Sequence, residues 1–198
     1  MKNSRVQLMA KIAVMGALAS IVMMLEFPLP LVPPFYKIDF SEVIVLLSGF
    51  ALGPLAAIGV EAIKILLHLL ISGSSTAGVG ELANFIIGCA LVLPATIVYQ
   101  KHKSRHNALI GMTIGTICLC IAGALMNYFV LLPAYAYAFH MPLSALIDIA
   151  QAVNPNINNL FTFICIGVIP FNLIKGILTS LIVFFVYKHV SPIIKKNY

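Results

Sequence analysis

Long apolar runs constrain this chain more than any other feature of its sequence. Five of them cover residues 6–27, 40–71, 79–100, 107–138 and 160–190. A helix of about 20 apolar residues can cross the hydrocarbon core of a bilayer. With 61% hydrophobic and 9% charged residues, the chain has too few polar groups to cover the surface of a soluble domain. We therefore predict an all-α, polytopic membrane protein.

The run 40–71 is too long for a single crossing. As one helix it would extend about 48 Å at 1.5 Å per residue, whereas the hydrocarbon core is roughly 30 Å thick. It contains Gly53-Pro54, a pair that favours a turn with proline opening the next helix. Dividing the run there gives one domain, residues 1–198, with six predicted transmembrane helices at 6–27, 40–52, 54–71, 79–100, 107–138 and 160–190. The second helix must then be short, tilted or extended by the preceding loop.

The distribution of charge supports six crossings and predicts the orientation. Nine of the twelve basic residues flank the apolar runs: Lys2, Arg5, Lys11, Lys101, Lys103, Arg105, Lys188, Lys195 and Lys196. Five of the six acids gather at the opposite ends: Glu26, Asp39, Glu42, Glu81 and Asp148. Because Lys and Arg are enriched on the cytoplasmic side, six crossings place both termini and residues 101–105 in the cytoplasm. The net charge of +6 then reflects topology and attraction to anionic lipid, and no nucleic-acid partner is expected.

Three outer connections follow from this topology. Residues 28–34 carry four prolines and predict a stiff, extended loop. Residues 72–78, rich in Gly and Ser, favour a flexible linker. Residues 142–153 have apolar positions at helical spacing but are too short to cross, which predicts an interfacial helix ahead of N-cap candidates at 154–159. We expect bends near Pro133 and Pro170 in the last two membrane helices.

No motif for catalysis or nucleotide binding is present. The sequence lacks GxxxxGK[ST], HExxH and GxSxG, and its four cysteines lie inside apolar runs without metal-ligand spacing to a histidine. We therefore expect neither an enzyme nor an ATPase, and no cofactor or metal. Energy for any transport must come from an ion gradient or from partner subunits.

Polar residues in or beside the apolar runs are the candidates for a binding site, because they are costly in a bilayer and usually face a cavity or one another. Asn172 and Lys175 lie three residues apart and share one helix face. The predicted substrate-binding residues are Asp39, Phe40, Glu42, Glu81, Asn84, Gly88, Asn127, Tyr128, Asn172 and Lys175. Polar groups that converge from separate helices between aromatic walls are typical of a small-molecule pocket. The alternatives are interhelical hydrogen bonds for the asparagines and favourable helix N-terminal charges for Asp39 and Glu42.

Glu61 and Lys64 lie in the middle of the third predicted helix, at a spacing that puts them on one face. An internal ion pair is the simplest interpretation. The alternative is a proton relay that includes His68, one turn further along, and would indicate a proton-coupled secondary transporter. No further acid continues such a relay, and no inverted repeat is evident in the sequence.

The first predicted helix carries a face of small residues at spacings of three and four. These residues are Ala10, Ala13, Gly16, Ala17 and Ser20. Because small side chains let two helices approach closely, this face predicts a helix–helix contact. Either a contact within the chain or a contact with another protein is consistent with the pattern.

Several of these features resemble the substrate-binding S components of energy-coupling-factor (ECF) vitamin transporters. The segment Ala13-Val-Met-Gly-Ala17 matches their AxxxA motif. The proline-rich loop, the Gly53-Pro54 turn and Asn172-Leu-Ile-Lys175 are similar to the riboflavin-specific members, and the resemblance covers nearly the whole chain. It implies a multi-pass protein of the bacterial plasma membrane that binds a vitamin with high affinity on the outer side and has no ATPase activity of its own.

The resemblance also implies a ligand and partners. S components associate with a transmembrane coupling subunit and two cytoplasmic ATPases, through the helix that here carries Ala13 and Ala17. Riboflavin would be the transported ligand rather than a cofactor, and its flat ring with a donor and acceptor edge suits amides, Lys175 and aromatic rings. The absence of Trp counts against thiamin, and the outer acids disfavour strongly anionic substrates. An S component for another vitamin is the nearest alternative.

Overall fold

The computed structural model describes the backbone of residues 2–30, 32–74 and 76–195, and the side chains of residues 5–30, 32–74 and 76–187. The helices are α1 (Lys2–Met23), α2 (Ser41–Leu52), α3 (Pro54–Ser72), α4 (Val79–Lys101), α5 (Arg105–Met126), α6 (Leu132–Ala138), α7 (Leu143–Val153), α8 (Leu160–Phe163) and α9 (Ile169–Lys195), with two π-helical segments, η1 (Asn127–Leu131) and η2 (Ile164–Val168). Among the basic residues used for topology, Lys196 and the side chains of Lys2, Lys188 and Lys195 lie outside the described residues.

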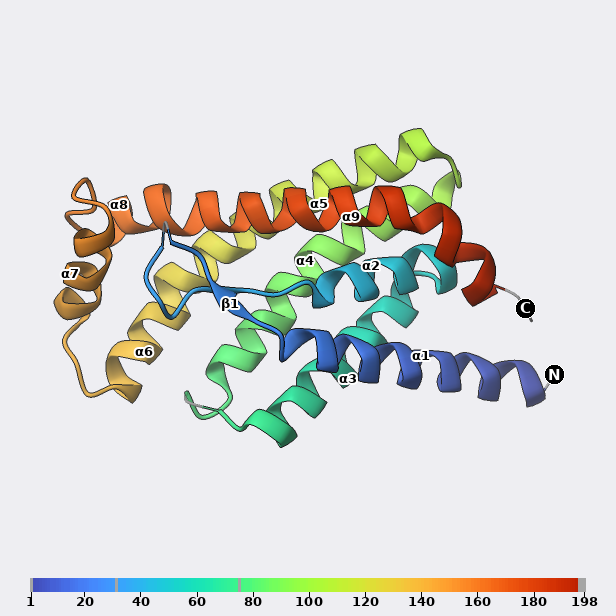
Figure 1. Cartoon of the computed structure of the whole chain (residues 1–198), viewed down its shortest axis with the longest axis horizontal. Helices are drawn as coiled ribbons and strands as arrows, with labels where there is room; N and C mark the ends of the chain where they lie inside the picture. Colours follow the sequence, from blue (N-terminus) through green and yellow to red (C-terminus); the bar gives the residue numbers. More distant parts are fainter. Residues whose placement is uncertain (1, 31, 75, 196–198) are drawn as a thin grey trace.

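The helices form an elongated bundle (Figure 1). Both ends of the chain and the α4–α5 turn lie at one end of the bundle, whereas α6, α7 and the α3–α4 loop lie toward the other. The basic segments near the two termini and at residues 101–105 therefore share one end. The predicted interfacial helix is confirmed as a helix, α7, which crosses the opposite end of the bundle.

Five described helices are long and apolar enough to cross a membrane: Arg5–Met23, Pro54–Ser72, Val79–Lys101, Arg105–Ala138 and Leu160–Tyr187. They correspond to five of the six predicted spans. The sixth, α2, has 12 residues and is about 18 Å long, which is short for a core of roughly 30 Å. Most of its residues are buried against α1, α3, α4 and α9. It ends as predicted, because Gly53 adopts a φ of 103° and Pro54 opens α3.

A π-helical segment precedes each proline that was expected to bend a helix. The N–H of Leu132, before Pro133, donates to the carbonyl of Asn127, five residues back. The N–H of Ile169, before Pro170, donates to Ile164 in the same way. Proline has no N–H and crowds the carbonyl four residues earlier, so a wider turn at this point relieves the clash. The distortion therefore takes the form of π turns.

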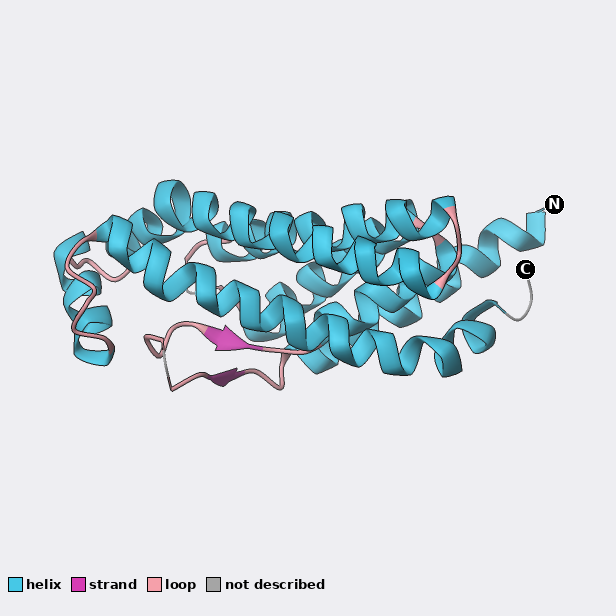
Figure 2. Ribbon diagram, turned by 90° about the horizontal axis from the view of Figure 1, so that it is seen from above, coloured by secondary structure: helices cyan, strands magenta, loops and turns pink. Residues whose placement is uncertain are grey.

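The proline-rich loop is a hairpin and not only an extended segment. Strand β1 (Phe27–Pro28) pairs antiparallel with β2 (Lys37–Ile38), and Figure 2 shows the two strands on one side of the helical bundle. An exposed ion pair of 2.5 Å between Glu26 and Lys37 lies beside the strands. Because backbone pairing between two short segments leaves no periodic signal, the all-α prediction missed this sheet.

Helices α4 and α5 pack closely at two glycines. A Cβ on Gly111 would lie 2.5 Å from the carbonyl oxygen of Ala95, and a Cβ on Gly115 would collide with that of Leu91. We predict that Gly115→Val lowers the free energy of unfolding by about 1–3 kcal/mol, the usual cost of overpacking a tight contact. Thermal unfolding in detergent measures the change. Thr113→Val, on the exposed face of α5, is the control, and equal losses in the two variants would contradict the packing argument.

Candidate binding site

A cavity of about 490 Å³ opens among the ends of the helices farthest from the termini. Its volume lies within the roughly 300–1,000 Å³ that is usual for small-molecule sites. Its walls come from the ends of α1 and α3, the β1–β2 hairpin, α4, η1, α6 and α9. The lining residues are Met23, Met24, Glu26, Phe35, Tyr36, Lys37, Asp39, His68, Ser72, Gly73, Thr76, Gly80, Glu81, Asn84, Ile87, Asn127, Leu131, Tyr135, Phe139, Phe171, Asn172 and Lys175.

Six of the ten predicted binding residues reach this cavity. They are Asp39, Glu81, Asn84, Asn127, Asn172 and Lys175. These side chains come from the segment before α2 and from α4, η1 and α9, so the fold brings together residues that are far apart in the chain. The other four, Phe40, Glu42, Gly88 and Tyr128, are not among the lining residues.

Glu42 belongs to a buried ion-pair cluster next to the cavity, and Gly88 lies against that cluster. Glu42 is 1% exposed and its Oε1 lies 2.7 Å from Lys64 Nζ. A Cβ on Gly88 would collide with the carboxylates of both Glu42 and Glu61, so this glycine makes room for the two acids. Sequence spacing could not reveal this, because the partner of Glu42 lies on a different helix.

Phe40 and Tyr128 make their contacts outside the cavity lining. The Phe40 ring packs against the hydrophobic core and near the Phe27 ring, at a centroid distance of 6.1 Å. Tyr128 follows Asn127 by one residue in η1, so the two side chains leave the helix in different directions. It is 40% exposed and contacts Phe129.

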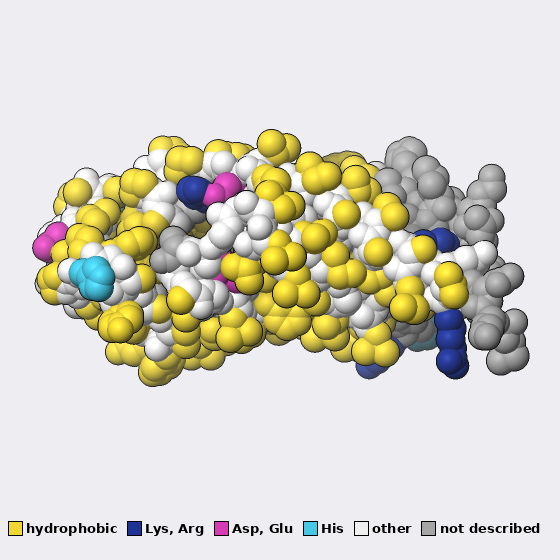
Figure 3. All heavy atoms as spheres, turned by 90° about the horizontal axis from the view of Figure 1, so that it is seen from below, with side chains coloured by type: hydrophobic (Ala, Val, Ile, Leu, Met, Phe, Trp, Pro, Cys, Tyr) yellow, Lys and Arg dark blue, Asp and Glu magenta, His cyan; other side chains and the backbone are white. Residues whose placement is uncertain are grey.

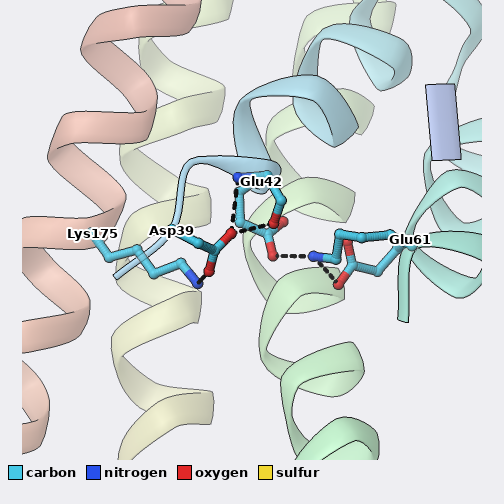
Figure 4. A network of polar contacts seen from close by, with 6 residues as sticks. Asp39, Glu42, Glu61 and Lys175 are labelled. Atoms are coloured by element: carbon cyan, nitrogen blue, oxygen red, sulfur yellow. Dashed lines mark hydrogen bonds and ion pairs between the residues drawn. The ribbon is translucent and has the colours of Figure 1, made fainter. Parts of the chain in front are cut away.

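Lys175 forms an ion pair with Asp39 at the cavity wall, with 3.0 Å between Nζ and Oδ2. Figure 4 shows the two side chains pointing toward one another. Ser41 donates both its backbone N–H and its hydroxyl to the other oxygen, Asp39 Oδ1. Burial disfavours the charge of Asp39, but the Lys175 and Lys64 ammonium groups and the Ser41 donors stabilise its ionised form. Asp39 is thus the structural partner of the buried Lys175, and the position of Lys175 in the sequence did not indicate it.

Asn127 is held at the cavity by two hydrogen bonds. The Tyr36 hydroxyl donates to Asn127 Oδ1 at 2.5 Å, and Asn127 Nδ2 donates to the carbonyl of Gly123 at 2.8 Å. Burial raises the pKa of the Tyr36 hydroxyl well above its usual value, so the phenol stays protonated and donates. The link joins the hairpin loop to η1 across one wall of the cavity.

Asn172 also bonds to its own helix. Its Nδ2 donates to the carbonyl of Val168 at 2.9 Å, and Gly123 on α5 leaves the space in which the amide lies. A side-chain amide has two N–H donors and an accepting oxygen, so these bonds leave hydrogen-bonding capacity at both asparagines. The bonds of the two amides thus run to their own helices and to the loop, rather than between membrane helices.

Side-chain hydrogen bonds from Ser74 and Thr76 link the α3–α4 loop to the start of α4. Ser74 Oγ donates to Glu81 Oε2 at 2.8 Å and accepts from the N–H of Gly78 at the same distance. Thr76 Oγ1 accepts from the N–H of Gly80. These bonds hold the loop against the start of α4, where Glu81 and Asn84 face the cavity.

Five aromatic residues complete the wall of the cavity, and residue spacing alone did not predict that they belong to the binding site. It consists of Phe35, Tyr36, Tyr135, Phe139 and Phe171. Ring centroids lie 5.8 Å apart for Phe35 and Tyr135, and 5.4 Å apart for Tyr36 and Phe171. The only sequence signal was the position of Phe35 and Tyr36 directly after the proline-rich loop.

The ion pair predicted between Glu61 and Lys64 is confirmed, with 2.8 Å between Oε1 and Nζ. Lys64 also contacts Glu42, a second partner that the sequence did not indicate. Figure 4 shows Asp39 between Lys175 and Glu42, with Glu61 farther along the same network.

The small face of α1 divides between the interior and the surface. A Cβ on Gly16 would collide with Ile63 on α3, and Ser20 is buried, so these two residues make an internal contact. Ala13 is exposed and Ala17 is half-buried. The two residues predicted to bind a partner therefore remain at least partly accessible.

Comparison with known proteins gives a consistent result. Residues 7–187 match the family described as ECF transporter, substrate-specific component. The chain is 34% identical to the riboflavin transporter FmnP of Bacillus subtilis over 98% of its own length and 96% of the relative. It is 37% identical to the riboflavin transporter RibU of Staphylococcus aureus over 93% and 90% of the two chains.

A solved structure supports the same assignment at the level of the fold. It is described as the S component of a bacterial ECF transporter, and it superposes with a TM-score of 0.75 at 32% identity, over 99% of this chain and 100% of the other. The helical bundle, the cavity and the match over nearly the full length lead to one conclusion. The chain belongs to the family of substrate-specific components of ECF transporters.

Proposed function

We propose that this chain captures riboflavin on the outer side of the bacterial plasma membrane and passes it inward with partner subunits. The observation that carries the proposal is the lining of the cavity, where amides, two ammonium groups and five aromatic rings surround a single space. Relatives at 34% and 37% identity are named riboflavin transporters, which supports the same ligand.

The chemistry of riboflavin matches this lining. Its flat ring system is apolar on its faces, which suits the aromatic wall, and has hydrogen-bond donors and acceptors on one edge. Asn127 and Asn172 can donate and accept along such an edge, and Lys175 can donate to a ring carbonyl or nitrogen. Because Asp39 balances the charge of Lys175, the pair suits an uncharged ligand.

The same proposal includes six crossings with both termini in the cytoplasm. Apolar side chains cover the middle of the molecule in Figure 3, and Lys and Arg gather at the end that holds the termini. This asymmetry favours that end as the cytoplasmic one. The cavity then opens toward the outer side, and α2 crosses the remaining depth together with the extended segment before it.

The absorption spectrum of the protein, purified from cells without added vitamin, tests the ligand. We expect flavin bands in the spectrum and quenching of flavin fluorescence when riboflavin is titrated into the stripped protein. Riboflavin should displace other vitamins from the site. A colourless protein that another vitamin saturates, and that riboflavin does not displace from it, would overturn the proposal.

We predict that Asn127→Ala weakens riboflavin binding by about 1–3 kcal/mol, the cost of losing a well-placed hydrogen bond. The substitution removes the amide that Tyr36 holds at the cavity wall. Fluorescence-quenching titrations measure the change in dissociation constant. Asn107→Ala, at the opposite end of α5, is the matched control, and equal affinities in the two variants would refute the assignment of Asn127.

A transmembrane coupling subunit and two cytoplasmic ATPases complete the proposed transporter, with Ala13 and Ala17 in the contact. Because Ala13 is exposed, we predict that Ala13→Leu leaves riboflavin binding unchanged but abolishes co-purification with the coupling subunit. Ala152→Leu, on the exposed face of α7, should retain co-purification. Riboflavin uptake into liposomes driven by a pH gradient without partners would instead support proton coupling through Glu61 and Lys64.

A further inference from the structure

Three ionisable side chains lie buried beside the cavity without belonging to its wall. Glu42 on α2, and Glu61 and Lys64 on α3, are each 1% exposed. Lys64 Nζ lies 2.7 Å from Glu42 Oε1 and 2.8 Å from Glu61 Oε1, so one ammonium group lies between two carboxylates (Figure 4). We refer to these three residues as the triad.

The charges of the triad do not balance. Two ionised carboxylates and one ammonium group sum to −1, in a position shielded from water. Among the described residues, Lys175 is another cation whose charge acts on the triad, and its partner is Asp39, so that pair is neutral. An uncompensated charge in such surroundings is strongly unfavourable, and a buried group then tends to bind a proton.

In the part of the chain that the structure describes, the elements around the triad supply no second cation at its level. Residues 12–20 of α1 carry no titratable group, and Glu42 is the only titratable residue of α2. Helix α4 contributes Cys89, next to Gly88, and α9 contributes Lys175, which faces Asp39. His68, one turn beyond Lys64 on α3, lines the cavity.

One oxygen of each carboxylate also lacks a hydrogen-bond donor. Among the described residues, Oε2 of Glu61 and Oε2 of Glu42 are buried without a hydrogen-bond partner, whereas Lys64 contacts Oε1 of both acids. An ionised carboxylate can only accept, whereas a protonated one is also a donor. A Cβ on Gly88 would collide with Oε1 of both acids, so the two carboxylates converge on one small space.

We propose that the triad binds one proton, held between Glu42 and Glu61, so that the buried group carries no net charge. The proton enters from water when the protein folds, and it stays with the protein while the ligand is transported. This site does not depend on the identity of the ligand. It differs from a proton relay because a retained proton transfers no charge across the membrane.

Infrared spectroscopy of the full chain in lipid counts such a proton directly. A protonated carboxylic acid has a carbonyl band separate from the carboxylate bands, and labelling of glutamate with ¹³C shifts it. At neutral pH we expect a band equivalent to one acid in the unmodified protein. A spectrum without this band, or a band that ¹³C-glutamate does not shift, overturns the proposal, and this measurement requires no variant. A bound metal cation in place of the proton would give the first of these results.

Three substitutions change the expected number of protonated acids. Glu61→Gln and Glu42→Gln each leave one acid opposite Lys64, so the band should be lost in both. Lys64→Met leaves two acids without a cation, so the band should double in any folded fraction. Glu81→Gln, at the cavity wall, is the matched control and should retain the single band. Retention of the band in both Glu42→Gln and Glu61→Gln would refute the site.

Discussion

Replacing Lys175 by Met is expected to lower the free energy of unfolding of the ligand-free protein by about 3–5 kcal/mol. The reason is that Asp39, which is 5% exposed, would remain buried and ionised without its cation. Chemical or thermal unfolding in detergent measures the loss. Lys37→Met is the matched control, because it breaks an exposed ion pair with Glu26 that is worth less than about 1 kcal/mol.

A second substitution separates the structural role of Lys175 from its proposed contact with riboflavin. In Asp39→Asn, Lys175→Met the buried charge is removed together with its partner, so most of the lost stability should return. If Lys175 also donates to the ligand, the double variant should still bind riboflavin about 1–3 kcal/mol more weakly than the unmodified protein. Full recovery of affinity would show that Lys175 acts only through the fold.

Replacing Lys64 by Met is expected to cost at least as much, about 3–5 kcal/mol at neutral pH, because the two buried acids would lose the cation that they share. The folded variant would then bind more protons than the unfolded chain. Stability should therefore rise as the pH is lowered, since acid favours the state that binds more protons. Unfolding measured over a series of pH values checks both the size and the sign of the effect.

The matched comparison for Lys64 uses the acids themselves. Lys64→Met combined with Glu61→Gln leaves one buried carboxylate instead of two, so part of the stability should return. Lys37→Met again reports the cost of losing a surface lysine. A loss in Lys64→Met no larger than in Lys37→Met would mean that the triad contributes little to the stability of the fold.

Local signals in the sequence predicted most of the helical architecture. The apolar runs and the Gly53-Pro54 break place five long helices and α2 close to where the structure has them. Both signals act within a few residues of the chain, so neither depends on tertiary contacts. The β1–β2 hairpin and the π segments before Pro133 and Pro170 were not predicted. They depend on which backbone N–H and carbonyl groups form hydrogen bonds with one another.

The candidate site was predicted only in part. Asn172 and Lys175 were identified because polar groups are costly within an apolar run, and both line the cavity. Glu42 gave the same signal but pairs with Lys64 instead. Composition and spacing could not distinguish a charged residue that lines the cavity, such as Lys175, from one that is buried in an ion pair beside it, such as Glu42. In both cases the sequence shows a charged residue in or beside an apolar helix.

The sequence by itself determined that this is a membrane protein, where its long helices lie and which loops carry the basic charge, because hydropathy and charge are properties of the chain. Only the tertiary structure decided which ammonium group faces which carboxylate, and which polar residues surround a cavity. A buried charge is stabilised by the opposite charge nearest in space. For Lys175 that partner lies 136 residues away in the chain, so no spacing rule could reveal it.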